Sequence, residues 1–179
     1  MNKRKRWDVL VDLLKNRSHY VGAEIGVWKG STTRKILDGL PGIKKFYAID
    51  PWLLYEGYQN YPGHNRGERV EKLDKIASIF MKSINKYNKK VIVIRKTSEQ
   101  ASFEIPDNYL DFVFIDGNHD YEYIKQDIEL WFPKVKTGGL FSGHDYNRSD
   151  GQSMGVKKAV DEVFDNINID DNYVWWLTK

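Results

Sequence analysis

The sequence predicts an α/β protein built on a doubly wound, mostly parallel sheet that ends in a C-terminal antiparallel hairpin. Three observations predict it: short apolar runs alternate with helical stretches, a glycine-containing turn follows the first run, and two short runs flank a polar turn at the end. Strands that alternate with helices are typical of βαβ units, whose parallel sheet is covered on both faces. The length of 179 residues fits one domain of ordinary size. We predict a single domain over residues 1–179.

Five short runs rich in β-branched and aromatic residues are predicted as buried parallel strands. They are Tyr20–Val27, Lys45–Ile49, Val91–Ile94, Leu110–Ile115 and Gly139–Ser142. The stretches with helical spacing are Ser31–Leu37, Arg66–Asn85, Ser98–Phe103, Tyr121–Trp131 and Val156–Phe164. We expect Ser31 to cap the first of these helices and Gly39 to end it.

The two ends of the chain add one element each. Residues 1–19 are predicted to hold an N-terminal helix, because their apolar residues repeat at helical spacing. Ile167–Ile169 and Tyr173–Thr178 are predicted to form the hairpin. Its neighbours Trp175 and Trp176 should cover opposite faces of the sheet, since successive side chains of a strand alternate.

The composition excludes several classes of site. The chain has no cysteine, which rules out disulfides, thiolate zinc sites and cysteine nucleophiles. Its net charge is +3, and its dense basic cluster is Lys3–Arg6, interpreted as a solubilising terminus, with contact to a polyanion as the alternative. No window approaches the roughly 20 apolar residues that span a bilayer. We therefore expect a cytoplasmic protein that binds neither nucleic acid nor membrane.

The turn after the first predicted strand has the pattern of a ligand site. Glu24, Gly26 and Gly30 are spaced Glu-x-Gly-x-x-x-Gly, and Trp28 stands where the dinucleotide-binding fingerprint has its second glycine. Glycines let a flat ligand approach the backbone. The carboxylate of Glu24 would repel a diphosphate and suit a cation, such as the sulfonium and ammonium groups of S-adenosylmethionine. An ordinary strand-to-helix turn is the alternative.

A second acid ends the next predicted strand. Asp50 lies about 20 residues beyond the first glycine, where a carboxylate can bind the two hydroxyls of a ribose. The alternative is a helix N-cap, because Asp-Pro also begins helices. After the third strand, Ser98 is predicted as an N-cap, and contact of Thr97 or Ser98 with an adenine edge stays open.

Polar residues also end the fourth and fifth predicted strands. Asp116, Gly117 and His119 follow one strand, and His144 and Asp145 follow the other. Because neighbouring parallel strands end at the same edge, we expect these side chains to converge. His119 and His144 are both candidates for a general base, with the bracing of loops as the alternative. Asp116, His144 and Asp145 are candidate ligands of Mg²⁺.

These motifs together resemble class I S-adenosylmethionine-dependent methyltransferases. The branch is one of small bacterial enzymes similar to macrolide-sugar O-methyltransferases and cephalosporin-hydroxylase-like proteins. The motifs are Glu24-x-Gly26-x-x-x-Gly30, Asp50-Pro51-Trp52, Ile115-Asp116-Gly117-Asn118-His119-x-Tyr121 and Gly138-Gly139-x-x-x-Gly143-His144-Asp145-Tyr146. The resemblance runs from about Tyr20 onward and implies a Rossmann-like fold, S-adenosylmethionine as cofactor and methyl transfer.

The resemblance also implies roles for single residues. The glycine motif would line the methionine part of the cofactor, and Asp50 would bind the ribose. Asp116 would lie beside the methyl group and bind metal, with His119 as the base. The sugar enzymes have an acidic pair where this chain has His144 and Asp145, so the metal requirement stays open. The expected cofactor site is completed by Trp28, Pro51, Trp52, Thr97, Ser98 and Gly117.

Residues 52–67 are aromatic and polar together and too irregular for a helix. Such segments are typical of functional lids, and aromatic faces suit a sugar ring. We predict a substrate lid here, and O-methylation of a sugar or another small hydroxylated acceptor. A loop packed on its own tyrosines is the alternative. The lid and the first helix are the surfaces on which a homo-oligomer would form.

Three other functions stay open. A scaffold could bind the cofactor without catalysis. An NAD-dependent oxidoreductase conflicts with Trp28 and with the missing third glycine of its fingerprint. A metal-dependent hydrolase could use the Asp and His residues of strands four and five, but it leaves the glycine turn and Asp50 without a purpose.

Overall fold

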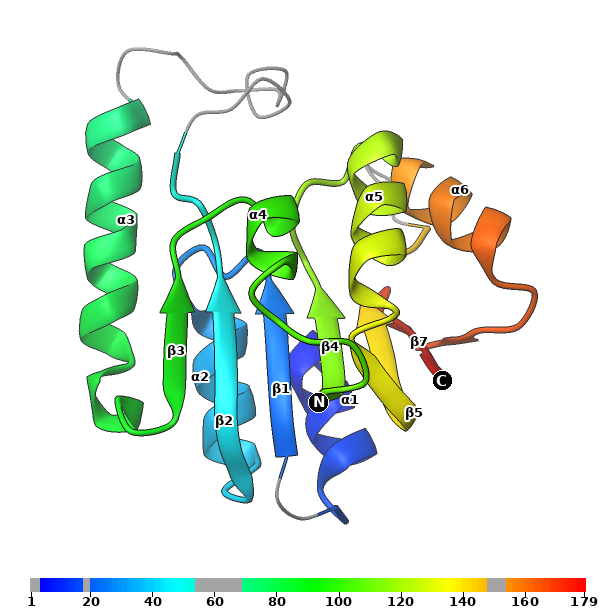
Figure 1. Ribbon diagram of the computed structural model, residues 1–179, viewed down its shortest axis with the longest axis horizontal. Helices are drawn as coiled ribbons and strands as arrows, with labels where there is room; N and C mark the ends of the chain where they lie inside the picture. The colour runs from blue at the N-terminus through cyan, green and yellow to red at the C-terminus, as the bar shows by residue number, and fades with distance from the viewer. Residues whose placement is uncertain (1–3, 18–19, 54–68, 148–153) are drawn as a thin grey trace.

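The centre of the computed structural model is a seven-stranded sheet in the order β3-β2-β1-β4-β5-β7-β6 (Figure 1). The structure describes residues 4–17, 20–53, 69–147 and 154–179. The first five strands pair in parallel, and β7 runs antiparallel to β5 and β6. The strands are β1 (Tyr20–Ile25), β2 (Ile43–Ile49), β3 (Val91–Ile94), β4 (Leu110–Ile115), β5 (Val135–Gly143), β6 (Asn168–Ile169) and β7 (Trp175–Thr178). The predicted Rossmann-like topology is confirmed, with its switch point between β1 and β4.

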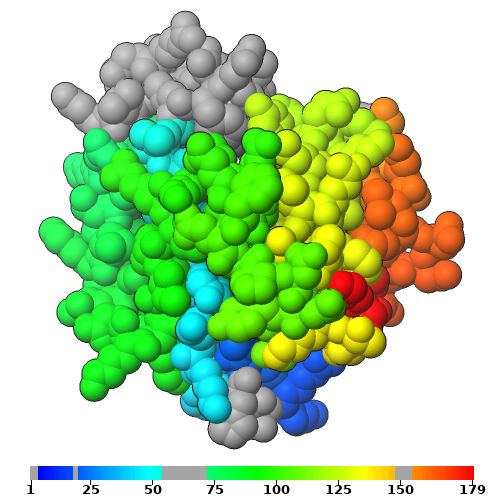
Figure 2. Space-filling model, in the orientation of Figure 1, coloured from blue at the N-terminus to red at the C-terminus, as the bar shows by residue number. Residues whose placement is uncertain are grey.

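Helices cover both faces of this sheet, as predicted. The helices are α1 (Arg6–Leu14), α2 (Ser31–Gly39), α3 (Arg69–Ser83), α4 (Ser98–Ser102), α5 (Tyr121–Trp131) and α6 (Met154–Val163), with the 3₁₀ turn η2 (Asn85–Tyr87) after α3. Side chains of α1, α2 and α3 pack on one face, and those of α4, α5 and α6 pack on the other. Figure 2 shows α4 and α5 covering much of the near face, with α6 at its margin.

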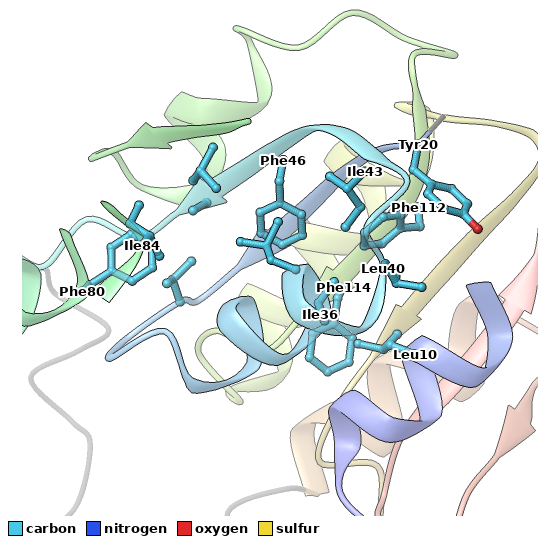
Figure 3. Close-up of a cluster of buried hydrophobic side chains, with 14 of the residues drawn as sticks. Leu10, Tyr20, Ile36, Leu40, Ile43, Phe46, Phe80, Ile84, Phe112 and Phe114 are labelled. Atoms are coloured by element: carbon cyan, nitrogen blue, oxygen red, sulfur yellow. The ribbon is translucent and has the colours of Figure 1, made fainter. Parts of the chain in front are cut away.

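The core consists of one apolar cluster on each face of the sheet. Phe112 and Phe114 of β4 pack with Leu10 of α1 and Ile36 of α2 on one side (Figure 3). Val113, between them in sequence, belongs to the cluster on the opposite side, because neighbours on a strand point to opposite faces. Each fully buried side chain of this kind stabilises the fold by about 1.5–3 kcal/mol. Burial on both faces accounts for the continuous apolar runs of the sequence.

The C-terminal hairpin is confirmed. Trp175 is buried in the cluster of the α4–α6 face, and Trp176 packs against the cluster of the α1–α3 face, as the alternation predicts. The fifth strand is longer than predicted, because β5 begins at Val135, which pairs with Leu110 of β4. Gly138, with a φ of 78°, made this part of the strand look like a turn.

Two helix caps differ from the prediction. The N-cap of α2 is Gly30, in the left-handed conformation, and Ser31 is the first helical residue. The N-cap of α4 is Thr97, whose hydroxyl accepts from the Gln100 N–H while the Gln100 side chain accepts from the Thr97 N–H. This reciprocal box outcompetes Ser98 for the cap. Gly39 ends α2 as predicted.

The predicted lid at 52–67 falls mostly outside the described residues and stays a prediction. Trp52 and Leu53 are described, and the next described residue is Arg69, the first of α3. In the described segments, no helix combines the length and the hydropathy needed to cross a bilayer.

Candidate active site

A cavity of about 660 Å³ lies at the carboxyl ends of the first four strands. Its wall comes from the residues after strands β1 to β5, from helices α2 to α5, and from Arg6 of α1. This volume is typical of a small-molecule site, and ligands of open α/β sheets bind at this edge. The predicted residues on the wall are Gly26, Trp28, Asp50, Pro51, Trp52, Thr97, Ser98, Asp116, Gly117, His119 and Asp145. Three predicted residues, Glu24, Gly30 and His144, are not part of this wall.

The two glycines of the first turn serve contacts within the protein. Gly26 has a φ of 88°, and a Cβ there would lie 2.3 Å from the Asp116 carbonyl oxygen. Gly30 has a φ of 74°, and a Cβ there would lie 2.4 Å from the Phe80 ring of α3. Phe80 fills the space in the Cβ direction of Gly30, and the predicted approach of a ligand to its backbone stays a prediction.

Glu24 lies beneath the glycine turn and is 1% exposed. Its Oε2 accepts a hydrogen bond from the Thr33 hydroxyl of α2. Burial raises the pKa of Glu24 to about 8, although the hydrogen bond from Thr33 opposes this. The side chain is thus protonated at neutral pH and joins β1 to α2. Glu24 is not on the cavity wall, and its predicted contact with a cationic ligand stays a prediction.

Asp50 holds together the turns that follow β1 and β2. Its Oδ2 accepts from the Trp28 N–H at 2.8 Å, and its Oδ1 accepts from the Trp52 N–H at 2.8 Å. Burial raises the pKa of Asp50, while these backbone N–H groups oppose the rise. Each carboxylate oxygen can accept more than one hydrogen bond, so bracing the turns leaves acceptor capacity for hydroxyls of a ligand. The alternative of a helix N-cap is wrong, because residues 51–53 form no helix.

Three wall residues that are not glycine have a left-handed backbone. Their φ angles are 52° at Trp28, 42° at Trp52 and 60° at Asp145. Each such residue costs about 1–3 kcal/mol, and residues of this kind concentrate at functional sites. The tryptophans are held by their surroundings: the indole N–H of Trp52 donates to the Trp28 carbonyl at 3.0 Å, and the Trp52 ring packs on Phe80 with centroids 5.3 Å apart.

A buried polar chain forms the wall between α4 and α5. The Ser98 hydroxyl donates to Asp127 and accepts from the indole N–H of Trp131. Burial raises the pKa of Asp127 to about 7, although the Ser98 hydrogen bond opposes this. The sequence interpretation missed Asp127, and its only signal was an acid on the apolar face of a predicted helix.

The polar residues of β4 and β5 converge as predicted. Nε2 of His119 lies 2.8 Å from Oδ2 of Asp145, and Nδ1 of His144 lies 3.1 Å from Oδ1 of Asp145 and 3.4 Å from Oδ1 of Asp116. Burial would lower the pKa of His144, but hydrogen bonds and charges of Asp116 and Asp145 raise it to about 9. Burial would likewise raise the pKa of Asp145, but the two histidines hold it well below its usual range. Asp145 is thus a charged acceptor between two imidazoles.

Two further residues of this region were missed by the sequence interpretation. Arg6 was assigned to a solubilising terminus, yet it lines the cavity and lies 3.3 Å from Asp116. Asn118 also lines the cavity, and its Nδ2 is buried with no hydrogen-bond partner among the described residues.

Comparison with known families decides the class of this site. Residues 23–146 match the model of a methyltransferase domain family, which covers well over half of the chain. The chain belongs to the class I S-adenosylmethionine-dependent methyltransferases. In this methyltransferase, the matched range includes the glycine turn, Asp50 and both Asp–His segments. The assignment favours the methyltransferase over the oxidoreductase and hydrolase alternatives.

Solved structures similar to this methyltransferase share its fold. The O-methyltransferase NovP has a TM-score of 0.69 and 19% identity, with 97% of this chain and 79% of that chain covered. An O-methyltransferase from Bacillus cereus in complex with SAH has a TM-score of 0.64 and 15% identity, with 97% and 80% covered. Spermidine synthase from Thermotoga maritima has a TM-score of 0.57 and 14% identity, with 94% and 57% covered. At these identities the likeness concerns the fold.

One curated protein matches part of the sequence. It is the "Uncharacterized protein y4gI" of Sinorhizobium fredii (strain NBRC 101917 / NGR234), 36% identical over 53 residues. The matched part is 30% of this chain, and the chain spans 6% of the length of that protein.

Proposed function

We propose that this methyltransferase transfers a methyl group from S-adenosylmethionine to a hydroxyl of a small acceptor, with His119 as the general base. The observation that carries the proposal is the His119–Asp145 pair, with 2.8 Å between Nε2 and Oδ2, on the wall of a cavity of cofactor size. A base oriented by a carboxylate is what removal of a hydroxyl proton needs.

The wall residues fit this cofactor. Asp50 can accept from ribose hydroxyls, and Ser98 and Asp127 lie where a base edge would find polar partners. Lys29 on the wall offers positive charge for a carboxylate. When bound, S-adenosylmethionine supplies the methyl group, whose bond to sulfur breaks as its bond to the acceptor oxygen forms.

His119 is the better candidate for the base than His144. Asp145 accepts from Nε2 of His119, which places the ring proton on Nε2, so Nδ1 is the atom proposed to take the hydroxyl proton. His144 lies off the cavity wall, and its Nδ1 is already engaged by Asp116, Asp145 and Arg6. Orientation of the acceptor and proton removal together account for the catalysis that methyl transfer requires.

A sugar is the first acceptor to test. The aromatic segment at 52–67 and the resemblance to sugar O-methyltransferases support it. NovP and the Bacillus cereus protein, which share the fold, are described as O-methyltransferases. Other small hydroxylated acceptors fit the same chemistry.

The test is a methyl-transfer assay over a panel of sugars and phenols that measures S-adenosylhomocysteine release. His119→Gln should lower kcat about 10²–10⁴-fold and leave S-adenosylhomocysteine affinity within about twofold. Asp145→Asn should also lower kcat, because the amide cannot orient the imidazole as an anion does. The surface variant Lys15→Gln should match the wild type.

Two outcomes would contradict this function. Full activity of His119→Gln would remove His119 from the mechanism. Tight binding of S-adenosylhomocysteine without turnover on any acceptor would favour the catalytically silent scaffold.

A further inference from the structure

The cluster in which the sequence predicts Mg²⁺ is already engaged by nitrogen atoms of neighbouring side chains. One ligand atom each from Asp116, His144 and Asp145 lies within 4.8 Å of the others. However, Nδ1 of His144 faces both carboxylates, at 3.4 Å and 3.1 Å, and His119 takes the second oxygen of Asp145. His144 therefore lies between the two carboxylates, and His119 occupies the other oxygen of Asp145.

Arg6 reaches the same cluster from the first residue of α1. Its Nε lies 3.3 Å from Oδ2 of Asp116 and donates to the Thr32 hydroxyl at 2.9 Å. Its Nη1 lies 3.2 Å from Nδ1 of His144. The side chain is only 32% exposed, and a guanidinium stays charged at every working pH. A permanent positive charge thus lies against two of the three candidate metal ligands.

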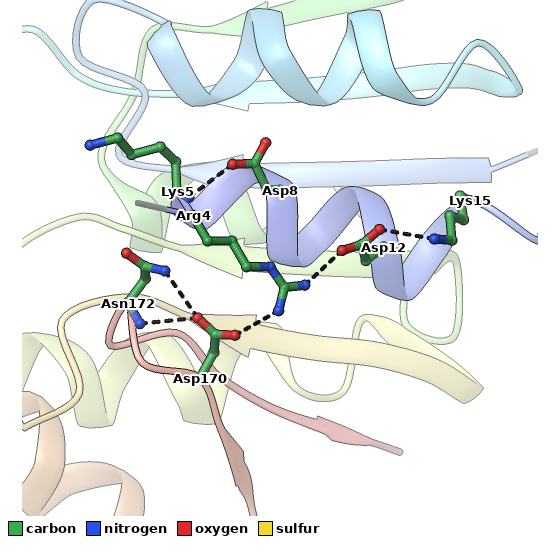
Figure 4. Close-up of polar contacts among 7 residues, drawn as sticks. All are labelled: Arg4, Lys5, Asp8, Asp12, Lys15, Asp170 and Asn172. Atoms are coloured by element: carbon green, nitrogen blue, oxygen red, sulfur yellow. Dashed lines mark hydrogen bonds and ion pairs between the residues drawn. The ribbon is translucent and has the colours of Figure 1, made fainter. Parts of the chain in front are cut away.

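Contacts on either side of Arg6 hold the start of α1 against the rest of the protein. Arg4 lies between Asp12 of α1 and Asp170 of the turn before β7, at 2.8 Å and 2.9 Å (Figure 4). Asp170 is in turn held by Asn172. Leu10 of α1 is fully buried in the core. The helix therefore presents Arg6 from a defined location.

These contacts do not fit a divalent cation. Mg²⁺ takes oxygen ligands in near-octahedral geometry at about 2.0–2.1 Å, whereas both oxygens of Asp116 and of Asp145 already face a nitrogen of His119, His144 or Arg6. A cation placed between Asp116 and His144 would also lie within a few ångströms of the guanidinium, and like charges at that distance repel.

We propose that the guanidinium of Arg6 takes the place of a divalent metal in this site. It neutralises Asp116, positions the Asp116–His144–Asp145 cluster and makes α1 part of the active site. Methyl transfer then needs no metal. This last consequence rests on the proposed function, whereas the assignment of Arg6 as the cation of the cluster does not.

The first measurement is Mn²⁺ binding by calorimetry to chelator-treated protein. Wild type and Arg6→Lys should bind Mn²⁺ no better than Lys15→Gln, a variant that removes an exposed charge at the other end of α1. Arg6→Gln should bind at least about tenfold more tightly than wild type, because the repulsion is gone. Circular dichroism establishes that each variant is folded. Stoichiometric Mn²⁺ binding by wild type, or equal affinity in wild type and Arg6→Gln, would overturn the assignment.

The second measurement separates this proposal from the proposed function. The same samples are titrated with S-adenosylhomocysteine and assayed for methyl transfer with and without chelator. We expect chelator-treated wild type to keep its activity and Arg6→Gln to lose it, with Mg²⁺ added or not. Activity that falls with chelator and returns with Mg²⁺ would contradict the metal-free site. Failure of the wild type to bind S-adenosylhomocysteine would contradict the proposed function and leave the Mn²⁺ result to decide on Arg6.

Discussion

Glu24→Gln should make this protein more stable at alkaline pH, which is unusual for the loss of an ionisable residue. Glu24 is 1% exposed, and burial raises its pKa to about 8 from an ordinary 4.5. The folded state therefore keeps the proton up to about pH 8, whereas the unfolded chain releases it above about pH 4.5. Between these values the unfolded state binds fewer protons, so the free energy of unfolding falls as the pH rises.

The size of this effect follows from the difference between the pKa values of Glu24 in the unfolded and folded states. A difference of one bound proton changes the free energy of unfolding by about 1.4 kcal/mol per pH unit. Ionisation of Glu24 therefore lowers the free energy of unfolding of the wild type by at most about 5 kcal/mol between acid pH and pH 8. Glutamine resembles the protonated carboxyl and can still accept from the Thr33 hydroxyl. The two proteins should thus differ little at pH 5, and the advantage of Glu24→Gln should grow steadily up to pH 8–9.

The assay is urea denaturation followed by tryptophan fluorescence at several pH values between 5 and 9. Glu162→Gln is the matched control, because Glu162 is an exposed residue whose pKa is lowered by Lys125 and Tyr121. Its stability relative to wild type should change little between pH 5 and 9, because solvent screens an exposed pair. A difference between wild type and Glu24→Gln that does not change with pH would refute the assignment of a protonated Glu24.

Substitutions at Gly26 and Phe80 should both destabilise the fold around the cavity. Gly26→Ala should lower the free energy of unfolding by more than about 2 kcal/mol and abolish S-adenosylhomocysteine binding. The reason is that a Cβ would lie 2.3 Å from the Asp116 carbonyl oxygen, at a backbone φ of 88°. A variant that binds S-adenosylhomocysteine with wild-type affinity would contradict this prediction. Phe80→Ala should lower the free energy of unfolding, measured by urea denaturation, by about 3–5 kcal/mol, because Phe80 is fully buried and packs on Trp52. A loss below about 1 kcal/mol would contradict this prediction.

The sheet and its covering helices could be predicted because each is encoded locally. The runs at β1 to β5 are apolar on both faces, and the helices between them repeat at helical spacing. The convergence of Asp116 with Asp145 follows from parallel strands that end at one edge. These parts of the account needed no tertiary detail.

The roles of several site residues depend on tertiary contacts, which a local sequence pattern does not predict. Whether Glu24 faces a ligand or lies under the turn depends on where α2 packs, and the role of Gly30 depends on Phe80, which comes 50 positions later in the sequence. Arg6 joins the active site only because α1 packs beside β4, with Arg4 bound to Asp170 at the far end of the chain. The predicted N-caps of α2 and α4 are each one residue too late, because two neighbouring residues in each turn are suited to the N-cap position.

S-adenosylmethionine is proposed to bind in the cavity at the switch point, and calorimetric titration with S-adenosylhomocysteine is the measurement to make first. NADH serves as the ligand control, and Asp50→Ala as the variant control, with its folding checked because Asp50 also braces two turns. We expect one micromolar site for S-adenosylhomocysteine, none for NADH, and a strong loss of affinity in folded Asp50→Ala. Absence of S-adenosylhomocysteine binding to the wild type, or binding that Asp50→Ala leaves unchanged, would contradict this proposal.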